Sequence, residues 1–195
     1  MPKAKERAVF LDRDGTIIFD RGYLKEAHEV CLLAGVGEAL ATLTEHGFAL
    51  VLISNQSGIG RGMITPEQAE QVHQAVVTRL LEFGVRLAAA FYCPHIPEEN
   101  CRCRKPSPEM ILRAALELRL DLAHSFMVGD KACDVEAGKR AGCRTILLQS
   151  GTAPLFCEPR PDVVACDWTE VLRYLSKTQD PSPYPLPSKE GERVG

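Results

Sequence analysis

Short apolar runs alternate with stretches of helical periodicity along most of the chain. The run at 48–53 (FALVLI) has no polar interruption, which is typical of a strand buried on both faces of a parallel sheet. Similar runs predict further strands over residues 8–11, 87–92, 125–128, 145–148 and 162–165. Apolar positions at helical spacing predict helices over residues 36–46, 65–83, 107–119, a segment that ends near 142, and 168–175.

Residues that cap helices flank several of these segments. Thr65 and Pro66 are suited to the N-cap and first position of a helix, and Ser107 with Pro108 repeats that pattern. Gly47 directly follows the helix at 36–46, as expected for a C-terminal stop. These signals fix where the predicted helices begin and end.

The regular order of strand and helix predicts an α/β fold: an open, doubly wound, Rossmann-like parallel sheet flanked by helices. In such sheets ligands bind at the carboxyl edge of the strands. Polar or reactive residues follow four of the predicted strands: Asp12 and Asp14, Ser54 and Asn55, Cys93 and His95, and Gly129 and Asp130. We therefore expect one functional site at this edge.

One folded domain is expected over residues 1–177. The spacings between the polar motifs, about 40 and 50 residues, leave no room for a separate cap domain once helices are assigned. We expect the cysteine-rich loop at 93–103 and residues 19–23 to cover the site instead. Residues 178–195 contain four prolines and no apolar periodicity, which predicts a disordered tail.

Bulk composition excludes several functional classes. The net charge is −3 and no basic stripe is present, which argues against nucleic-acid binding. No apolar run approaches the roughly 18 residues of a membrane-spanning helix. The first residues lack the apolar core of a secretion signal, so we expect a cytoplasmic protein. No spare apolar segment is evident, which favours a monomer.

The segment FLDRDGT carries the clearest chemistry. Asp12 and Asp14 are separated by one residue at a strand end, so both carboxylates can reach one small site. Asp12 can attack phosphorus, because the resulting acyl phosphate is itself readily hydrolysed. Asp14 can protonate the leaving oxygen and then remove a proton from water. The alternative for an isolated Asp-x-Asp is a turn or a calcium-like site.

Two carboxylates facing a phosphate require a cation, and Mg²⁺ is suited to such oxygen ligands. Asp130 can complete a Mg²⁺ site with Asp12 and the backbone carbonyl of Asp14. Asp134, one helical turn later, can orient Lys131 or a metal-bound water. Side chains at Ser54 and Asn55 can donate to phosphoryl oxygens, and Lys105 can neutralise the transferred group.

A dense cluster of metal-ligand residues lies between 93 and 103. It contains three thiols and one imidazole: Cys93, His95, Cys101 and Cys103. This set matches a closed tetrahedral Zn²⁺ site with a structural role, which would position Arg104 and Lys105 directly after its last ligand. The scattered cysteines are interpreted as small buried apolar residues: Cys31, Cys133, Cys143, Cys157 and Cys166.

In order, these motifs resemble the haloacid dehalogenase superfamily of phosphohydrolases. The resemblance rests on DxDGT, a strand ending in Ser-Asn, a lysine before a helix, and GDxxxD, over about residues 8–150. It implies a Mg²⁺-dependent phosphomonoesterase with Asp12 as nucleophile and Asp14 as acid/base.

Within that superfamily, DRGY, SNQSGIGRG and CPHxP…CxCRKP resemble the D-glycero-D-manno-heptose-1,7-bisphosphate 7-phosphatase family. Those enzymes serve the synthesis of nucleotide-activated heptose for bacterial lipopolysaccharide. The resemblance implies Mg²⁺ at Asp12, Asp14 and Asp130, structural Zn²⁺ at the cysteine cluster, and a sugar phosphate substrate. It also implies a substrate-binding set: Asp20, Arg21, Gly22, Tyr23, Ser54, Asn55, Gln56, Ser57, Arg104, Lys105 and Lys131. Arg104 would bind the distal part of the substrate, its second phosphate.

Two alternatives remain open at the level of sequence. Histidinol-phosphatases share DxDGT and the zinc loop, so histidinol phosphate is the competing substrate. In a different class, the chain could be a non-catalytic binding module built on the zinc loop, with degenerate aspartates. Turnover of a phosphate ester separates the enzyme from the module.

Overall fold

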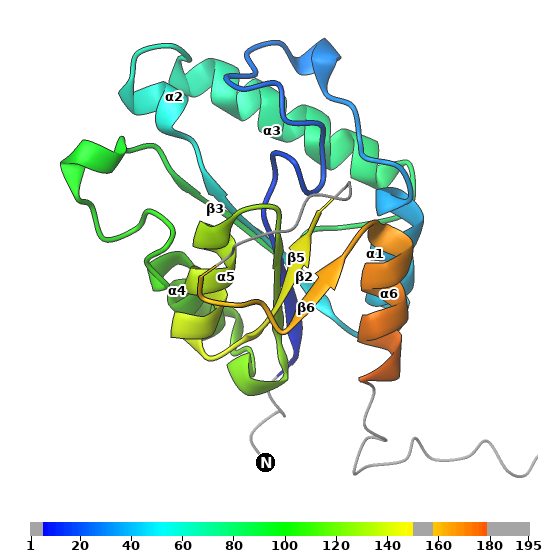
Figure 1. The fold of residues 1–195 in the computed structure, drawn as a ribbon. Helices are drawn as coiled ribbons and strands as arrows, with labels where there is room; N and C mark the ends of the chain where they lie inside the picture. The colour runs from blue at the N-terminus through cyan, green and yellow to red at the C-terminus, as the bar shows by residue number, and fades with distance from the viewer. Residues whose placement is uncertain (1–5, 150–157, 179–195) are drawn as a thin grey trace, which may run out of the picture.

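A six-stranded parallel sheet forms the centre of the protein in the computed structural model, which describes residues 6–149 and 158–178 (Figure 1). Its strands are β1 (Ala8–Leu11), β2 (Ala49–Asn55), β3 (Ala89–Cys93), β4 (Phe126–Gly129), β5 (Arg144–Leu148) and β6 (Val163–Ala165). The strand order is β3-β2-β1-β4-β5-β6, and every pairing is parallel. The chain thus winds outward from β1 to β3, returns to β4 and continues to β6. This confirms the predicted doubly wound sheet.

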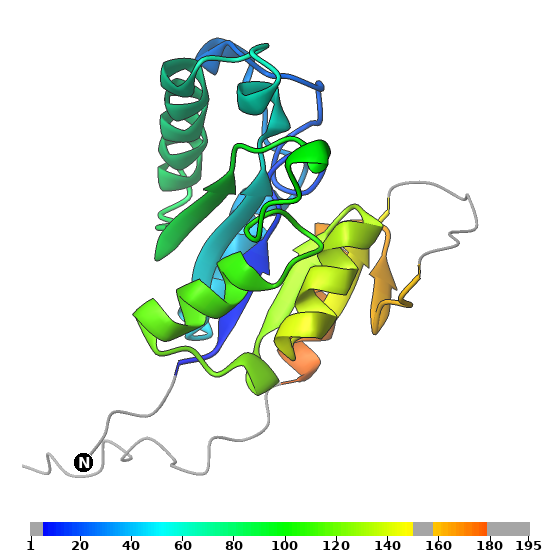
Figure 2. The ribbon, with the colours of Figure 1, turned by 90° about the vertical axis from the view of Figure 1, so that its left-hand side faces the viewer.

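Helices cover both faces of the sheet. They are α1 (Val36–Glu45), α2 (Ser57–Gly60), α3 (Pro66–Leu81), α4 (Glu109–Leu118), α5 (Ala132–Ala141) and α6 (Trp168–Lys177). Helices α4 and α5 lie side by side on one face, as Figure 2 shows. Apolar residues of α1, α3 and α6 join the core on the other face. No separate cap domain is inserted within the described residues.

Strand β1 shows why its run is continuously apolar. Val9 and Leu11 belong to the core under α1, α3 and α6, whereas Ala8 and Phe10 belong to the core under α4 and α5. All four side chains are fully buried. Since successive strand residues point to opposite faces, only a strand covered on both sides needs this pattern. The burial of β1 also fixes Asp12 at the carboxyl edge of the sheet.

Helix boundaries follow their caps closely. Thr65 accepts a hydrogen bond from the Gln68 backbone N–H and Pro66 begins α3, as predicted. Helix α4 begins at Glu109 after Pro108, so the expected N-cap at Ser107 is one residue early. Proline here takes the N-cap position, since its missing N–H costs nothing there.

Two departures from the expected elements affect the site. Strand β2 continues through Ser54 and Asn55, which are therefore its last residues and not the start of a loop. The helix α2 was not expected, because its sequence SGIG contains two glycines and has low helix propensity. Tertiary contacts hold it: the Gly60 backbone N–H donates to Pro94 (2.9 Å), and a Cβ at Gly58 would lie 2.7 Å from Tyr23.

The interpretation of the scattered cysteines was partly wrong. Cys143 is buried, but Cys31 and Cys166 are exposed. Both lie outside the two-sided core, Cys31 in the loop after β1 and Cys166 after the edge strand β6. Cys157 and residues 179–195 of the predicted tail lie outside the described residues.

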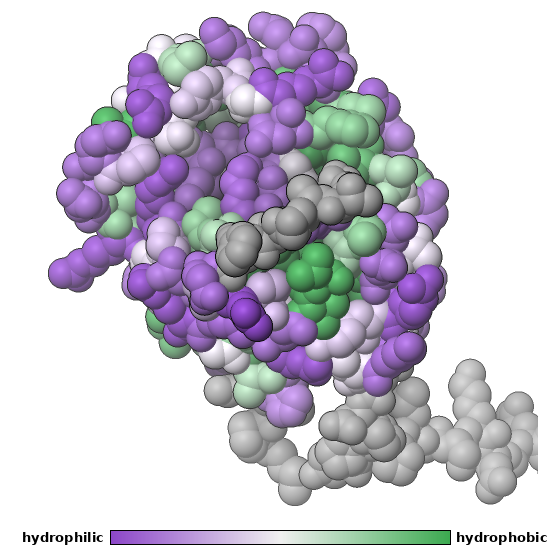
Figure 3. Space-filling view, in the orientation of Figure 1, coloured by the Kyte–Doolittle hydropathy of each residue, from purple (hydrophilic) through white to green (hydrophobic). Residues whose placement is uncertain are grey.

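The surface carries both hydrophilic and apolar areas. The face shown in Figure 3 is mainly hydrophilic, with smaller apolar areas between the polar ones. In the part of the chain that the structure describes, no helix combines the length and apolar character needed to cross a membrane.

Trp168 connects the last helix to the turn that follows β1. Its side chain is buried, and its indole N–H donates to the backbone carbonyl of Thr16 (2.8 Å). The two residues are 152 positions apart in sequence, so α6 anchors a turn formed at the opposite end of the chain. Buried backbone carbonyls need such a partner.

We predict that Trp168→Phe lowers the free energy of unfolding by about 1–2 kcal/mol, because the Thr16 carbonyl loses its donor. Trp168→Ala should cost about 3–5 kcal/mol, since it also leaves a cavity. Urea unfolding followed by circular dichroism measures both. Leu116→Ala, at a side chain 82% exposed, is the control and should change stability by less than about 0.5 kcal/mol. A Trp168→Phe variant as stable as the parent would contradict this anchor.

Candidate active site and metal centres

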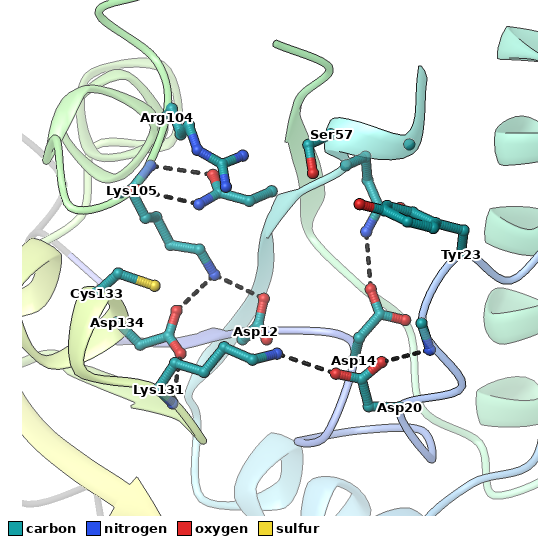
Figure 4. A pocket seen from close by; sticks show the side chains of 14 residues that line it. Asp12, Asp14, Asp20, Tyr23, Ser57, Arg104, Lys105, Lys131, Cys133 and Asp134 are labelled. Atoms are coloured by element: carbon teal, nitrogen blue, oxygen red, sulfur yellow. Dashed lines mark hydrogen bonds and ion pairs between the residues drawn. The ribbon is translucent and has the colours of Figure 1, made fainter. Parts of the chain in front are cut away.

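A pocket of about 390 Å³ opens at the carboxyl edge of the central strands. Its walls come from the loop after β1, the end of β2, the start of α2, the segment before α4 and the start of α5. The lining residues are Asp12, Asp14, Asp20, Gly22, Tyr23, Asn55, Gln56, Ser57, Gly58, Arg104, Lys105, Lys131, Cys133 and Asp134 (Figure 4). Most of the predicted site residues therefore meet in one place, because parallel strands deliver their carboxyl ends to one edge.

Lys105 lies at the centre of the charge distribution. Its ammonium is 2.6 Å from Asp12 Oδ1 and 2.6 Å from Asp134 Oδ1, and it donates to the Ile53 carbonyl at 2.8 Å. The side chain is almost fully buried. Burial alone would lower the pKa of Lys105, but the two carboxylates raise it above its ordinary value. The lysine is therefore charged, and its ammonium lies directly against the Asp12 carboxylate.

Asn55 fixes the backbone of this lysine. Its side-chain amide donates to the Lys105 carbonyl and accepts from the Lys105 N–H, both at 3.0 Å. The end of β2 is thereby joined to the segment after the cysteine cluster. Asn55 lines the pocket, but its hydrogen bonds are directed to Lys105. Ser54 is buried outside the pocket lining, and its hydroxyl accepts from Gln56 Nε2 at 2.8 Å.

Asp14 is held by two side chains of the same site. Arg13 donates to both of its carboxylate oxygens, with contacts of 2.9–3.1 Å, and Gln56 Nε2 donates to Oδ2 at 2.8 Å. Burial raises the pKa of Asp14, an effect that Arg13 opposes and the nearby Asp12 reinforces, and the balance is upward. Sequence reasoning missed Arg13 because the middle position of Asp-x-Asp carries no recognisable chemical signal.

A second group of carboxylates gathers beside Asp12. One oxygen each from Asp12, Asp130 and Asp134 lies within 4.8 Å of the others. Burial raises the pKa of Asp130 to about 7, and the nearby negative charge of Asp12 adds to this shift. A Cβ at Gly15 would lie only 2.3 Å from Asp130 Oδ2, so a glycine is required for this close approach.

This cluster fits a Mg²⁺ site, and it contains two of the expected ligands, Asp12 and Asp130. Asp130 Oδ1 is buried and has no hydrogen-bond partner among the described residues. A buried carboxylate oxygen without a donor is costly unless a cation binds it. Asp134 belongs to this group because Gly129 leaves room for its side chain. A Cβ on residue 129 would lie 2.3 Å from the Cβ of Asp134.

Asp134 was expected to orient Lys131 or a metal-bound water, and its contact with Lys131 is made to the backbone and not to the ammonium. Asp134 Oδ2 accepts from the backbone N–H of Lys131 at 3.0 Å, as an N-terminal cap of α5. The Lys131 ammonium instead points to Asp20 (3.1 Å) and Asp130 (3.4 Å), with the Asp20 contact visible in Figure 4. The short reach of an aspartate at the third helical position explains this, since it turns back to the first-turn backbone.

The segment 19–23 forms one side of the pocket mouth. Asp20 accepts from the Gly22 N–H at 2.8 Å and is bridged by Lys131 to the start of α5. Gly22 and Tyr23 line the pocket, whereas Arg21 is exposed and is not part of the lining. Cys133 also lines the pocket and was not expected there.

The cysteine cluster is assembled as predicted. Ligand atoms of Cys93, His95, Cys101 and Cys103 all lie within 4.8 Å of one another. The Cys93 Sγ–Cys103 Sγ distance is 3.2 Å, and His95 Nδ1 lies 3.2 Å from Cys103 Sγ. Three thiols and one imidazole nitrogen converging in this way fit a four-ligand Zn²⁺ site. Arg104 follows the cluster and donates to the His95 carbonyl at 3.2 Å.

Comparison with known proteins agrees with this geometry. A HAD-hydrolase-like family model matches residues 102–171. The D-glycero-beta-D-manno-heptose-1,7-bisphosphate 7-phosphatase of Yersinia pestis is 43% identical over 168 residues, covering 83% of this chain and 88% of the relative. The enzyme of the same name from Escherichia coli K12 is 38% identical over 187 residues, covering 90% and 96%.

Solved structures show the same relationship. D,D-heptose 1,7-bisphosphate phosphatase from B. bronchiseptica, complexed with magnesium and phosphate, has a TM-score of 0.79 and 33% identity, covering 88% of this chain and 98% of that one. A putative HAD-like phosphatase from Mesorhizobium loti has a TM-score of 0.77 and 31% identity, covering 90% and 88%. The identity and coverage settle the relationship: this chain belongs to the haloacid dehalogenase-like phosphatase family that includes the curated heptose-bisphosphate phosphatases.

Proposed function

We propose that the protein removes the 7-phosphate of D-glycero-beta-D-manno-heptose 1,7-bisphosphate by way of an aspartyl phosphate on Asp12. The 43% identity to the Yersinia pestis enzyme, across 88% of that enzyme, carries the choice of substrate. The reaction would serve the synthesis of nucleotide-activated heptose for bacterial lipopolysaccharide. A non-catalytic binding module no longer fits, because the curated relatives are phosphatases and the carboxylates of the pocket are intact.

In the first half-reaction Asp12 attacks the 7-phosphorus. A bond forms between Asp12 and phosphorus as the bond from phosphorus to the sugar oxygen breaks. Asp14 gives its proton to that leaving oxygen, for which a carboxyl with a raised pKa is suited. Lys105, beside Asp12, offsets the negative charge that gathers on the transferred group.

In the second half-reaction water replaces Asp12 on phosphorus. Asp14, now ionised, takes a proton from that water as its oxygen attacks. The bond between Asp12 and phosphorus breaks, and inorganic phosphate is released. Asp14 regains its proton in this step, so the residue is ready for the next substrate.

Asp12, Asp130 and the backbone carbonyl of Asp14 would hold the catalytic Mg²⁺, and Asp134 belongs to the same carboxylate cluster as Asp12 and Asp130. When bound, Mg²⁺ supplies positive charge that brings the phosphate up to the carboxylates. Lys131 spans Asp20 and Asp130, so it can orient the Asp130 carboxylate and contact the substrate.

The remaining pocket residues would contact the sugar and its other phosphate. Arg104 lines the pocket and has no carboxylate partner among the described residues. One of its amino groups donates to the His95 carbonyl, and the rest of its guanidinium is available for a second phosphate. Sugar hydroxyls would meet lining residues at the pocket mouth and the start of α2, with the exposed Arg21 beside them: Asp20, Gly22, Tyr23, Asn55 and Ser57. Ser54 would help to hold Gln56 in place, because its hydroxyl accepts a hydrogen bond from the Gln56 amide. The proposal includes a cytoplasmic, monomeric enzyme.

The nucleophile is tested by Asp12→Asn. We expect turnover of both heptose bisphosphate and p-nitrophenyl phosphate to fall by at least about 10³-fold, because an amide cannot form the covalent intermediate. Asp121→Asn is the matched control, since Asp121 lies outside the pocket and an asparagine preserves its cap to Ala123. Retained turnover in Asp12→Asn would refute the proposed chemistry.

Substrate choice is tested by measuring kcat/KM for heptose 1,7-bisphosphate and for histidinol phosphate. The bisphosphate should be preferred by about 10²-fold or more, because histidinol phosphate leaves Arg104 without an anion. Both anomers of the 1-phosphate should be included, and the beta form is expected to be faster. Equal or faster hydrolysis of histidinol phosphate would overturn the substrate assignment and leave the chemistry intact.

The role of the cysteine cluster is tested by Cys101→Ser. Loss of one Zn²⁺ ligand should lower Tm by about 5–10 °C and raise KM, since the loop positions Arg104. Cys31→Ser, at an exposed cysteine outside the cluster, is the matched control. Zinc content, Tm and KM that are all unchanged in Cys101→Ser would show that the cluster is not a structural metal site. Withholding Mg²⁺ should instead remove activity and leave Tm nearly unchanged.

A further inference from the structure

Arg13 is a fully buried cation that the catalytic steps above do not use. Its side chain is among the largest buried ones, with only 1% of the residue exposed. Within the described part of the chain its one carboxylate partner is Asp14, at 2.9 Å. A buried guanidinium without such a partner is strongly unfavourable. The ion pair with Arg13 therefore fixes the position of the Asp14 carboxylate.

The backbone of Arg13 is fixed as firmly as its side chain. Its carbonyl accepts from the N–H groups of Thr16 (3.4 Å), Ile17 (2.9 Å) and Ile18 (3.0 Å). These bonds close the turn that follows β1. The guanidinium therefore projects from a rigid base and not from a mobile loop, as a residue that sets the geometry of its neighbour requires.

Gln56 completes the contacts of Asp14 from the other strand. Its Oε1 accepts from Arg13 (2.9 Å), and its Nε2 donates to Asp14 Oδ2 (2.8 Å) and Ser54 (2.8 Å). Rotating the amide by half a turn would place its oxygen against the carboxylate and its NH₂ against the guanidinium. The orientation of Gln56 is thus determined by both charged partners.

Together the two side chains occupy both Asp14 oxygens. Oδ1 accepts from Nε and Nη2 of Arg13, and Oδ2 accepts from Nη2 of Arg13 and from Gln56. Such contacts fix both the position and the plane of the carboxylate. The Asp14 side chain lines the pocket and is 14% exposed.

We propose that Arg13 and Gln56 are a positioning pair that aligns the Asp14 carboxyl with the leaving oxygen of the substrate. Neither residue transfers a proton; they act through Asp14. This inference rests on the proposed acid/base role of Asp14. It also gives Gln56 a role different from the direct substrate contact that the sequence implies.

The test compares two substrates that differ in their need for an acid. The alkoxide leaving from heptose bisphosphate needs a proton, whereas p-nitrophenolate leaves without one. In Arg13→Lys and Gln56→Met, kcat/KM for heptose bisphosphate should fall about 10–100-fold, a part of the 10²–10⁴-fold that a general acid contributes. For p-nitrophenyl phosphate it should fall less than about threefold. Gln56→Met preserves side-chain length, so it keeps the test valid if Arg13→Lys folds poorly.

Two further measurements separate positioning from damage to the fold. Arg113→Lys, in an exposed pair on α4, is the control and should leave both substrates unaffected. In an Asp14→Asn background, Arg13→Lys and Gln56→Met should cause no additional substrate-selective loss, because the group they align is gone. Equal losses on both substrates, no loss, or a selective loss that persists without Asp14 would each overturn the inference.

The same experiment distinguishes this inference from the proposed function. If Asp14→Asn itself reduced both substrates equally, the acid role of Asp14 would be wrong. If Asp14→Asn were selective for heptose bisphosphate but Arg13→Lys and Gln56→Met were not, only the positioning role would fail.

Discussion

The crowding of carboxylates at one edge of the sheet is the constraint on which the rest of the site depends. Asp12, Asp130 and Asp134 approach within 4.8 Å, and Asp14 lies on the same turn as Asp12. Such charges repel unless cations lie between them. Lys105 supplies one cation from within the protein, and the group as a whole is suited to a bound divalent ion. The same arrangement that costs stability prepares the site to receive a phosphate together with its metal.

Each neighbouring feature has a clear relation to that crowding. Gly15 and Gly129 lack the Cβ atoms that would strike Asp130 and Asp134. Asn55 hydrogen-bonds to the backbone of Lys105 and thereby keeps the lysine ammonium beside the carboxylates. The cysteine cluster then connects the end of β3 to the same lysine. With no cap domain inserted between residues 6 and 149, a loop held by the cysteine cluster can place Arg104 and Lys105 at the pocket.

Much of this could be predicted from the sequence, because strong local signals coincide with global ones. The apolar runs gave all six strands, since a sheet covered on both faces leaves no polar position in strands such as β1. The residues after those runs gave Asp12, Lys105 and the cysteine cluster. Where a site is built from strand ends in a parallel sheet, topology converts spacing in sequence into proximity in space.

The remainder depended on side-chain directions that no pattern records. Arg13 looks like an ordinary surface arginine in the sequence, yet it is buried against Asp14. Gln56 reads as a loop residue, and only the path of β2 turns its amide toward two charges. Helix α2 has the composition of a turn and is helical because of its tertiary contacts. Exposure of Cys31 likewise depends on the path of a long loop.

The proposed mechanism requires one carboxylate at the tip of β1, that of Asp12, to accept the phosphoryl group. A crystal structure of the Mg²⁺-loaded protein with beryllium fluoride, a mimic of a bound phosphoryl group, tests it most directly. Beryllium is expected on a carboxylate oxygen of Asp12, beside the Lys105 ammonium. Beryllium fluoride bound to any other side chain, with Asp12 unmodified, would contradict the account.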